Sequence, residues 1–375
     1  MKLNRHNTVW KGYMTGKRLL AAFLGASLLL SGCGPAGGSQ GAFDASSEEN
    51  GKLKVAVTLF PYYDFVRQIA GDQVDLQMVI PAGMDSHSFE PTPADIRTIQ
   101  HADVLISNGG TMEHWLDETL AALDTTNMTI VTMMDYVDTV EEEIVEGMED
   151  AGHDHDHAHS HAAADDHDHS HETPEEHAAH AHEADDHDYV DHDGHEEEIE
   201  YDEHIWTSPV NAMRMVDVIA ETLTERDPDH GAMYQAGAAA YLEELERLDK
   251  EFREVRDSAV HDMIVMGDKF PLRYFADTYG LRYRAAFSGC SSDTEPSART
   301  IAYLIDKVKE EGLPVIYYLE LSSHRVAEII GEETGAVPLL FHSCHNVTRR
   351  QFEEGVTYLE LMEQNVKNLR EGLCK

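Results

Sequence analysis

Short runs of apolar, β-branched residues alternate along most of the chain with runs whose apolar residues recur at helical spacing. The apolar runs predict buried strands at 53–59, 74–80, 104–109 and 128–134, and again at 263–267, 281–287, 315–320 and 337–341. Thr92 and Ser208 each precede a proline, which is typical of a helix N-cap. This alternation predicts mostly parallel sheets covered by helices on both faces, an α/β fold.

One uninterrupted helical run separates the two sets of predicted strands. It is rich in Ala, Glu, Leu and Arg, has no proline after Pro228, and covers roughly thirty residues, or about 45 Å of helix. We therefore predict two Rossmann-like lobes with mostly parallel sheets, joined by one long connecting helix. The boundaries are an N-terminal α/β lobe at 52–227, a linking helix at 228–258 and a C-terminal α/β lobe at 259–375.

A segment of His, Asp and Glu at 141–203 interrupts the first lobe, and we expect a disordered loop because it has almost no apolar residues to bury. Between Gly152 and Glu196 it holds 14 of the chain's 24 histidines. Unprotonated imidazole suits Zn²⁺, Cu²⁺ and Ni²⁺, and the carboxylates raise the local cation concentration. A solvated loop without a specific role is the alternative. The regular spacing of histidine favours a protein that handles a transition metal, above all zinc.

Residues 1–33 have the features of a lipoprotein signal peptide and lipobox. Five Lys and Arg side chains precede an apolar stretch at 19–30 that is too short for a permanent membrane span. The stretch is followed by Ser-Gly-Cys, so we expect cleavage before Cys33, acylation of Cys33, and a flexible tether at 34–51. The predicted location is extracytoplasmic, lipid-anchored to the bacterial cell membrane. A plain secretory signal and an N-terminal anchor helix are the alternatives.

The charge balance indicates a cationic ligand. The formal net charge is −43, and loss of the five positive side chains of the signal would bring it to about −48. Such a charge argues against nucleic acid or an anionic membrane surface as a ligand, and it is consistent with attracting cations.

Three cysteines remain besides Cys33, namely Cys290, Cys344 and Cys374. An extracytoplasmic location permits a disulfide, and Cys290–Cys344 is our prediction. A metal-bound or free thiol is the alternative, which the sequence leaves open.

Two histidines lie on loops where a two-lobed α/β protein is expected to bind a ligand. His87 lies between a predicted strand and the helix start at Thr92. His204 lies between the histidine-rich segment and the helix start at Ser208. Ligands of such proteins bind at the carboxyl ends of strands, in the crevice between lobes, and loops stiffened by proline suit a preorganised metal ligand. A lone loop histidine is more often a surface residue, so the spacing alone leaves both interpretations open.

Two longer motifs, PAGMDSHSFEPTPADIRTIQHADVLISNG and HIWTSPVNA, resemble the zinc and manganese receptors of ABC importers known as cluster A-I. The resemblance covers essentially everything after Cys33, and zinc members often carry a His-rich acidic loop in the same place. It implies that His87 and His204 are the metal ligands of the first lobe. It also implies a monomeric high-affinity receptor, not an enzyme, that delivers Zn²⁺ to an ABC transporter permease and its ATPase.

The second lobe departs from the family pattern. The usual third ligand is a His or Glu, but the matching stretch GDKFPLRYFADTYGL is two residues longer, and Asp268 is our prediction there. Pairing of Asp268 with Arg273, or capping of the next helix, is the alternative. The usual fourth ligand is an Asp, whereas LLFHSCHNVT offers His345 as the preferred ligand and His342 or Cys344 as further candidates.

This ligand set favours zinc over manganese. Two histidines with an aspartate or a third histidine form a four-coordinate Zn²⁺ site, whereas Mn²⁺ prefers more carboxylate. A manganese receptor of the same family is one alternative. A secreted zinc-dependent hydrolase, or a metal-buffering surface lipoprotein or adhesin that depends on the histidine-rich segment alone, are alternatives of a different class. A hydrolase would need an open coordination position and a general base, and the sequence has no H-E-x-x-H motif.

Overall fold

The structure, a computed structural model, describes residue 43 and residues 51–148, 200–289, 291 and 295–375. The chain divides into two units, Met1–Ser39 and Gln40–Lys375, and the fold below belongs to the second. The predicted signal peptide, the lipidation site Cys33, nearly all of the tether and most of the segment 141–203 lie outside the described residues. Among the described helices, none combines the length and the apolar character that crossing a bilayer requires.

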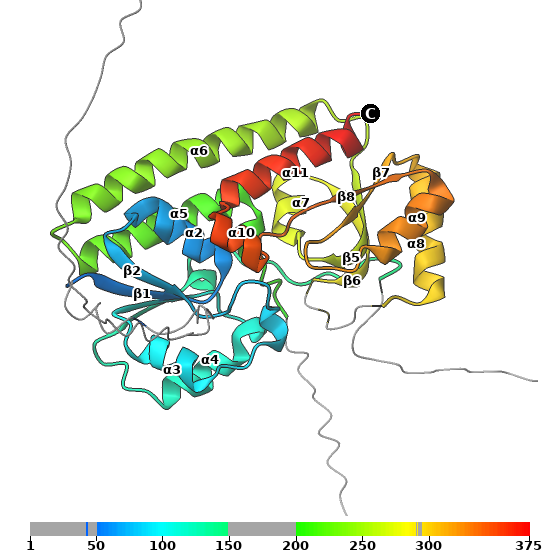
Figure 1. The fold of residues 1–375 in the computed structure, drawn as a ribbon. Coiled ribbons are helices and arrows are strands. Elements are labelled where there is room, and N and C mark those ends of the chain that lie inside the picture. The colour runs from blue at the N-terminus through cyan, green and yellow to red at the C-terminus, as the bar shows by residue number, and fades with distance from the viewer. Residues whose placement is uncertain (1–42, 44–50, 149–199, 290, 292–294) are drawn as a thin grey trace, which may run out of the picture. The chain divides into compact units, whose positions relative to one another are not determined.

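The first lobe is built on a sheet of four parallel strands in the order β2-β1-β3-β4 (Figure 1). These strands are β1 (Leu53–Val57), β2 (Val74–Met78), β3 (Val104–Ser107) and β4 (Thr129–Thr132). The helices are α2 (Phe60–Ala70), α3 (Pro93–Gln100), α4 (His114–Ala121) and α5 (Pro209–Arg226). Single 3-10 turns form η1 (Ser86–Ser88), η2 (Thr111–Glu113), η3 (Met133–Tyr136) and η4 (Ile205–Thr207). In the central strands β1 and β3, residues 55–57 and 104–106 are apolar and completely buried, as a sheet covered on both faces requires.

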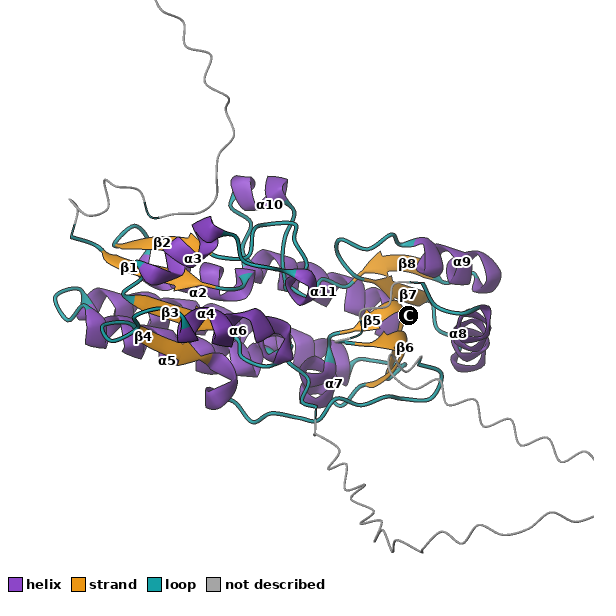
Figure 2. Cartoon of the chain, turned by 90° about the horizontal axis from the view of Figure 1, so that it is seen from below, coloured by secondary structure: helices purple, strands orange, loops and turns teal. Residues whose placement is uncertain are grey.

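The second lobe repeats this plan with the strand order β6-β5-β7-β8, again all parallel. Its strands are β5 (Met263–Phe270), β6 (Arg282–Ser288), β7 (Val315–Tyr318) and β8 (Val337–Leu340). Its helices are α7 (Arg273–Tyr279), α8 (Ala298–Glu311), α9 (Arg325–Thr334), α10 (Arg349–Glu354) and α11 (Tyr358–Leu373). Figure 2 shows the strands gathered into two separate sheets, each flanked by helices.

Strand β5 is longer than the sequence predicts and contains a bulge. The prediction ended this strand at 267, whereas the strand ends at 270. Met266 pairs with Ala285 and Lys269 with Phe287, so β5 has one more residue than β6 over this stretch. An extra residue in one strand changes the direction in which the neighbouring side chains point. The bulge lies at the predicted ligand Asp268 and therefore bears directly on the site.

A single helix, α6 (Gly231–Asp257), connects the lobes. Its 27 residues correspond to about 40 Å. It packs on α2 and α5 of the first lobe and on α7 and α11 of the second. Tyr234, Tyr241, Leu248 and Phe252 lie on its buried face at helical spacing. The predicted α/β class, the parallel sheets and the connecting helix are thus confirmed.

The last helix also ties the two lobes together. Asp64 in α2 is completely buried, and its carboxylate accepts a hydrogen bond of 2.7 Å from the backbone N–H of Tyr358 at the start of α11. The Arg67 side chain donates to Asp64 and, at 2.7 Å, to the carbonyl of Val356. These partners compensate the burial of the Asp64 charge. The loop before α11 is therefore fixed against the first lobe.

Candidate metal centre

His87 lies on the loop that follows β2, in the turn η1. The Asp85 carboxylate caps this turn by accepting the backbone N–H of His87 at 3.0 Å. Beyond the turn, Phe89 is buried, and Thr92 and Asp95 form a capping box that begins α3. Thr92 is thus confirmed as an N-cap. The loop is held on both sides of His87, which limits the positions open to its ring.

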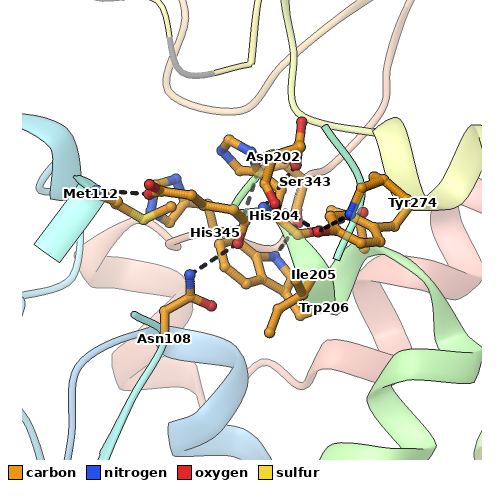
Figure 3. Close-up of polar contacts among 12 residues, drawn as sticks. Asn108, Met112, Asp202, His204, Ile205, Trp206, Tyr274, Ser343 and His345 are labelled. Carbon is orange, nitrogen blue, oxygen red and sulfur yellow. Dashed lines mark hydrogen bonds and ion pairs between the residues drawn. The ribbon is translucent and has the colours of Figure 1, made fainter. Parts of the chain in front are cut away.

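His204 lies immediately before η4 and is only 1% exposed. The Asp202 carboxylate accepts the backbone N–H of His204 at 2.8 Å and lies 3.3 Å from its Nδ1 (Figure 3). With its proton on Nδ1, the ring donates to Asp202 and keeps the Nε2 lone pair free for a metal. The Tyr274 hydroxyl, from the second lobe, donates to the Asp202 carbonyl at 2.7 Å. Ser208 caps α5 by accepting the N–H of Asn211, as predicted.

Two buried carboxylates hold the backbone next to His204. Glu203 accepts the backbone N–H of Met112 at 2.7 Å, and its own carbonyl accepts the side-chain amide of Asn108 at 3.0 Å (Figure 3). Glu113 accepts the backbone N–H of Asn108 at 2.9 Å. Burial raises the pKa of Glu113 to about 7 and raises the pKa of Glu203 as well. The backbone leading into His204 is therefore packed into the first lobe.

His345 reaches the same place from the second lobe, on the loop after β8. The residues beside it bind the first lobe directly. The Trp206 indole N–H donates to the carbonyl of Ser343 at 2.8 Å (Figure 3). The side-chain amide of Asn346 donates to two carbonyls of the His87 loop, including that of Met84 at 2.7 Å. The His345 loop is thus fixed to both loops that carry the other histidines.

The structure brings His87, His204 and His345 into one cluster. Their nitrogen donor atoms all lie within 4.8 Å of one another, and their ring centroids are 5.7 to 5.9 Å apart. Zinc binds imidazole nitrogen at about 2.0–2.1 Å, which places tetrahedral donors about 3.4 Å apart. Small shifts would therefore bring all three donors onto one ion. Ser86 is hydrogen-bonded to Nε2 of His345 and helps to orient that ring.

Burial favours the neutral form of His87 and His345. It lowers the pKa of His87 to about 4, and the neighbouring His204 and Lys269 add to the effect. Burial also lowers the pKa of His345 well below its usual value, with His204 and His87 as further causes. Neutral imidazole has a free lone pair, which is the form that binds a metal. At neutral pH both rings are therefore ready to bind a cation without first losing a proton.

The three histidines line a cavity of about 270 Å³. Asp268 and Lys269, next to the bulge in β5, line the same cavity. The Asp268 carboxylate, however, lies outside the donor cluster and accepts the backbone N–H of Lys269 at 2.9 Å. The alternative, an ion pair between Asp268 and Arg273, does not occur among the described residues. Arg273 instead pairs with Glu143 and Asp277.

The further candidates His342 and Cys344 are also outside the cluster. The His342 ring is buried, accepts the backbone N–H of Cys344 at 2.9 Å and lies 3.4 Å from the Glu320 carboxylate. Cys344 is a fully buried free thiol, and burial raises its pKa. The predicted Cys290–Cys344 disulfide involves Cys290, which lies outside the described residues.

Sequence reasoning missed the residues that position the cluster. Asp202 is the one that the sequence could have indicated, since a carboxylate two residues before a histidine can accept that histidine's backbone N–H. The contacts of Trp206 with Ser343 and of Asn346 with the His87 loop join residues 137 or more positions apart. No local sequence pattern predicts such contacts.

Comparison with known proteins identifies relatives over nearly the whole described chain. Residues 55–372 match the family described as zinc-uptake complex component A periplasmic, or ZnuA. The high-affinity zinc uptake system protein ZnuA of Bacillus subtilis is 30% identical over 347 residues, covering 92% of this chain and 94% of that protein. The zinc-binding lipoprotein AdcA of Streptococcus pneumoniae is 29% identical over 86% of this chain. The aligned region spans only 56% of that protein's length.

Solved structures agree with the fold. The metal-dependent lipoprotein YcdH of Bacillus subtilis superimposes with a TM-score of 0.64 at 26% identity, over 86% of this chain and 100% of that one. The Zn(II)-bound ZnuA-like domain of Streptococcus pneumoniae AdcA gives a TM-score of 0.63 at 27% identity, over 87% and 100%. The likeness extends through both lobes.

Proposed function

Because the chain belongs to the family of periplasmic zinc-uptake component A proteins, we propose that it is an extracytoplasmic receptor for Zn²⁺. It captures one ion between its lobes and delivers it to the permease and ATPase of an ABC importer. The convergence of His87, His204 and His345 from three separate loops carries this proposal. The names of its relatives, a zinc uptake protein and a zinc-binding lipoprotein, support the same cargo.

The donor set favours zinc over manganese. Three imidazole nitrogens suit a borderline-soft ion, whereas Mn²⁺ prefers carboxylate and a higher coordination number. His87 and His204 come from the first lobe and His345 from the second, so the ion is bound by both lobes at once. The carboxylate of Asp202 fixes the orientation of the His204 ring, which lowers the cost of ordering it when the ion binds. The proposed site has these three protein ligands, and a ligand role for Asp268 stays a prediction from the sequence alone.

The receptor role includes an attachment to the membrane. We assign lipidation to Cys33, after removal of the signal peptide, and expect a monomer that binds its permease with both lobes. The protein carries a cargo and catalyses no reaction. Zinc-loaded receptor should therefore stimulate the ATPase of its importer, and the His345→Ala variant should not.

Zinc affinity tests the proposal most simply. The mature full-length protein is given one equivalent of zinc in competition with a chromophoric chelator. Replacement of His87, His204 or His345 by alanine should weaken binding by more than the roughly 10- to 100-fold that is typical of losing a supporting residue. His101→Ala, at an exposed histidine outside the cluster, is the matched control. Equal affinities in all four variants would contradict the proposal, and stronger binding of Mn²⁺ would identify a manganese receptor instead.

A further inference from the structure

Lys269 places a positive charge beside a candidate cation site. It follows the bulge in β5, is half-buried and lines the same cavity as the three histidines. Within the described residues, no ion pair or hydrogen bond engages its ammonium group. A lysine at this place repels a dication and attracts an anion.

The carboxylates around the cavity are hydrogen-bonded to backbone N–H groups. Asp85 accepts the backbone N–H of His87, Asp268 accepts that of Lys269, and Glu320 accepts that of Ser343. None of them belongs to the donor cluster. The three imidazoles therefore leave one position of a tetrahedral site without a protein donor.

The cavity has room for more than the ion. Its volume of about 270 Å³ is well above the roughly 10–15 Å³ that a cavity needs to hold one water molecule. A small anion of several atoms therefore fits beside a metal bound to the histidines.

We propose that Zn²⁺ is bound here together with one small exogenous anion, whose oxygen takes the fourth coordination position while Lys269 binds its negative charge. The anion is a carboxylate or an inorganic oxyanion such as bicarbonate. This inference rests on the proposed zinc-receptor function and adds the anion to it. Lys269 is then a specificity-determining residue, because it admits zinc in an anionic complex and disfavours the bare ion.

Simple repulsion between Lys269 and the metal would give a different result from binding of an anion. If the ammonium group only repels the metal, its removal should tighten zinc binding whatever anion is present. If it binds the co-ligand, its removal should cancel the effect of the anion. Replacing Lys269 by glutamine separates the two, since the variant keeps a side chain of similar length without the charge.

The test measures zinc affinity of the full-length protein by chelator competition at constant ionic strength. It compares a perchlorate buffer, whose anion coordinates weakly, with added acetate or bicarbonate. The wild type should bind zinc about tenfold more tightly with the added anion, which is in the range of a charge-assisted hydrogen bond. Lys269→Gln should lose this gain. Lys367→Gln, at an exposed lysine of α11, should keep it.

Three outcomes are separable. A tight zinc site in the wild type that does not respond to either anion overturns the inference but leaves the receptor function intact. Tighter binding by Lys269→Gln in every buffer overturns it in favour of simple repulsion. Absence of any tight zinc site in the wild type contradicts the proposed function itself. One equivalent of Co²⁺ gives a second readout, because its visible absorption should change on addition of acetate in the wild type and not in Lys269→Gln.

Discussion

Replacement of Asp202 by asparagine tests how far the zinc affinity depends on a residue that does not touch the metal. Asp202 is 2% exposed. Its carboxylate accepts the backbone N–H of His204 and lies 3.3 Å from the ring Nδ1, from which it accepts a hydrogen bond when that nitrogen carries the proton. Asparagine keeps the shape and one acceptor oxygen but loses the charge that favours the metal-binding tautomer. Losses of such partners typically cost 10- to 100-fold in metal affinity. We expect about tenfold for Asp202→Asn and about a hundredfold for Asp202→Ala.

The assay is zinc competition with a chromophoric chelator, combined with thermal unfolding of the metal-free protein. Asp103→Asn is the matched control, because Asp103 also accepts a backbone N–H, that of Lys54 at 2.9 Å. It precedes β3, at the end of the sheet opposite to the ligand loops. The reasoning is refuted if Asp202→Asn binds zinc as tightly as the control. It is also refuted if Asp202→Asn lowers the folding stability of the metal-free protein by as much free energy as it lowers zinc binding.

Three further predictions concern pH, the histidine-rich segment and the second lobe. Burial lowers the pKa of His87 to about 4, so the unfolded chain binds a proton that the folded chain does not. The metal-free wild type should therefore lose more stability than metal-free His87→Ala as the pH falls from about 6.5 towards 4, because the raised pKa of Glu113 acts in the opposite direction in both proteins. Equal losses in thermal unfolding would contradict this. Deletion of 152–195 should leave one tight zinc per protein by calorimetry, and loss of tight binding would show that the segment belongs to the site. Asp268→Asn should weaken zinc binding by less than about tenfold, and His345→Ala by far more; equal losses would make Asp268 a ligand.

The fold was largely predictable because the sequence patterns that indicate strands and helix starts are local. Periodic apolar runs predicted all eight strands of the described residues, and proline after Thr92 and Ser208 predicted two helix starts that the structure contains. The apolar pattern did not mark the bulge in β5, although the stretch that begins with Gly-Asp-Lys is two residues longer than the family pattern. The extra residue of the bulge governs the position of Asp268 and Lys269 relative to the cavity.

The candidate site was predictable only in part. The motif around His87 and His204 indicated two of the clustered histidines, and the choice of His345 over its neighbours agrees with the cluster. His342 differs from His345 in burial and partners, and Trp206 reaches its loop from a distant part of the chain. Burial and long-range hydrogen bonds arise from tertiary packing, which sequence spacing does not contain.

The central claim is that imidazoles from both lobes bind one divalent ion. Anomalous diffraction at the zinc edge, from crystals of the full-length protein loaded with one equivalent of zinc, measures this directly. The account predicts one peak at about 2.0–2.1 Å from a ring nitrogen of each of His87, His204 and His345. A peak elsewhere, or a peak that lacks any one of the three rings, would contradict it.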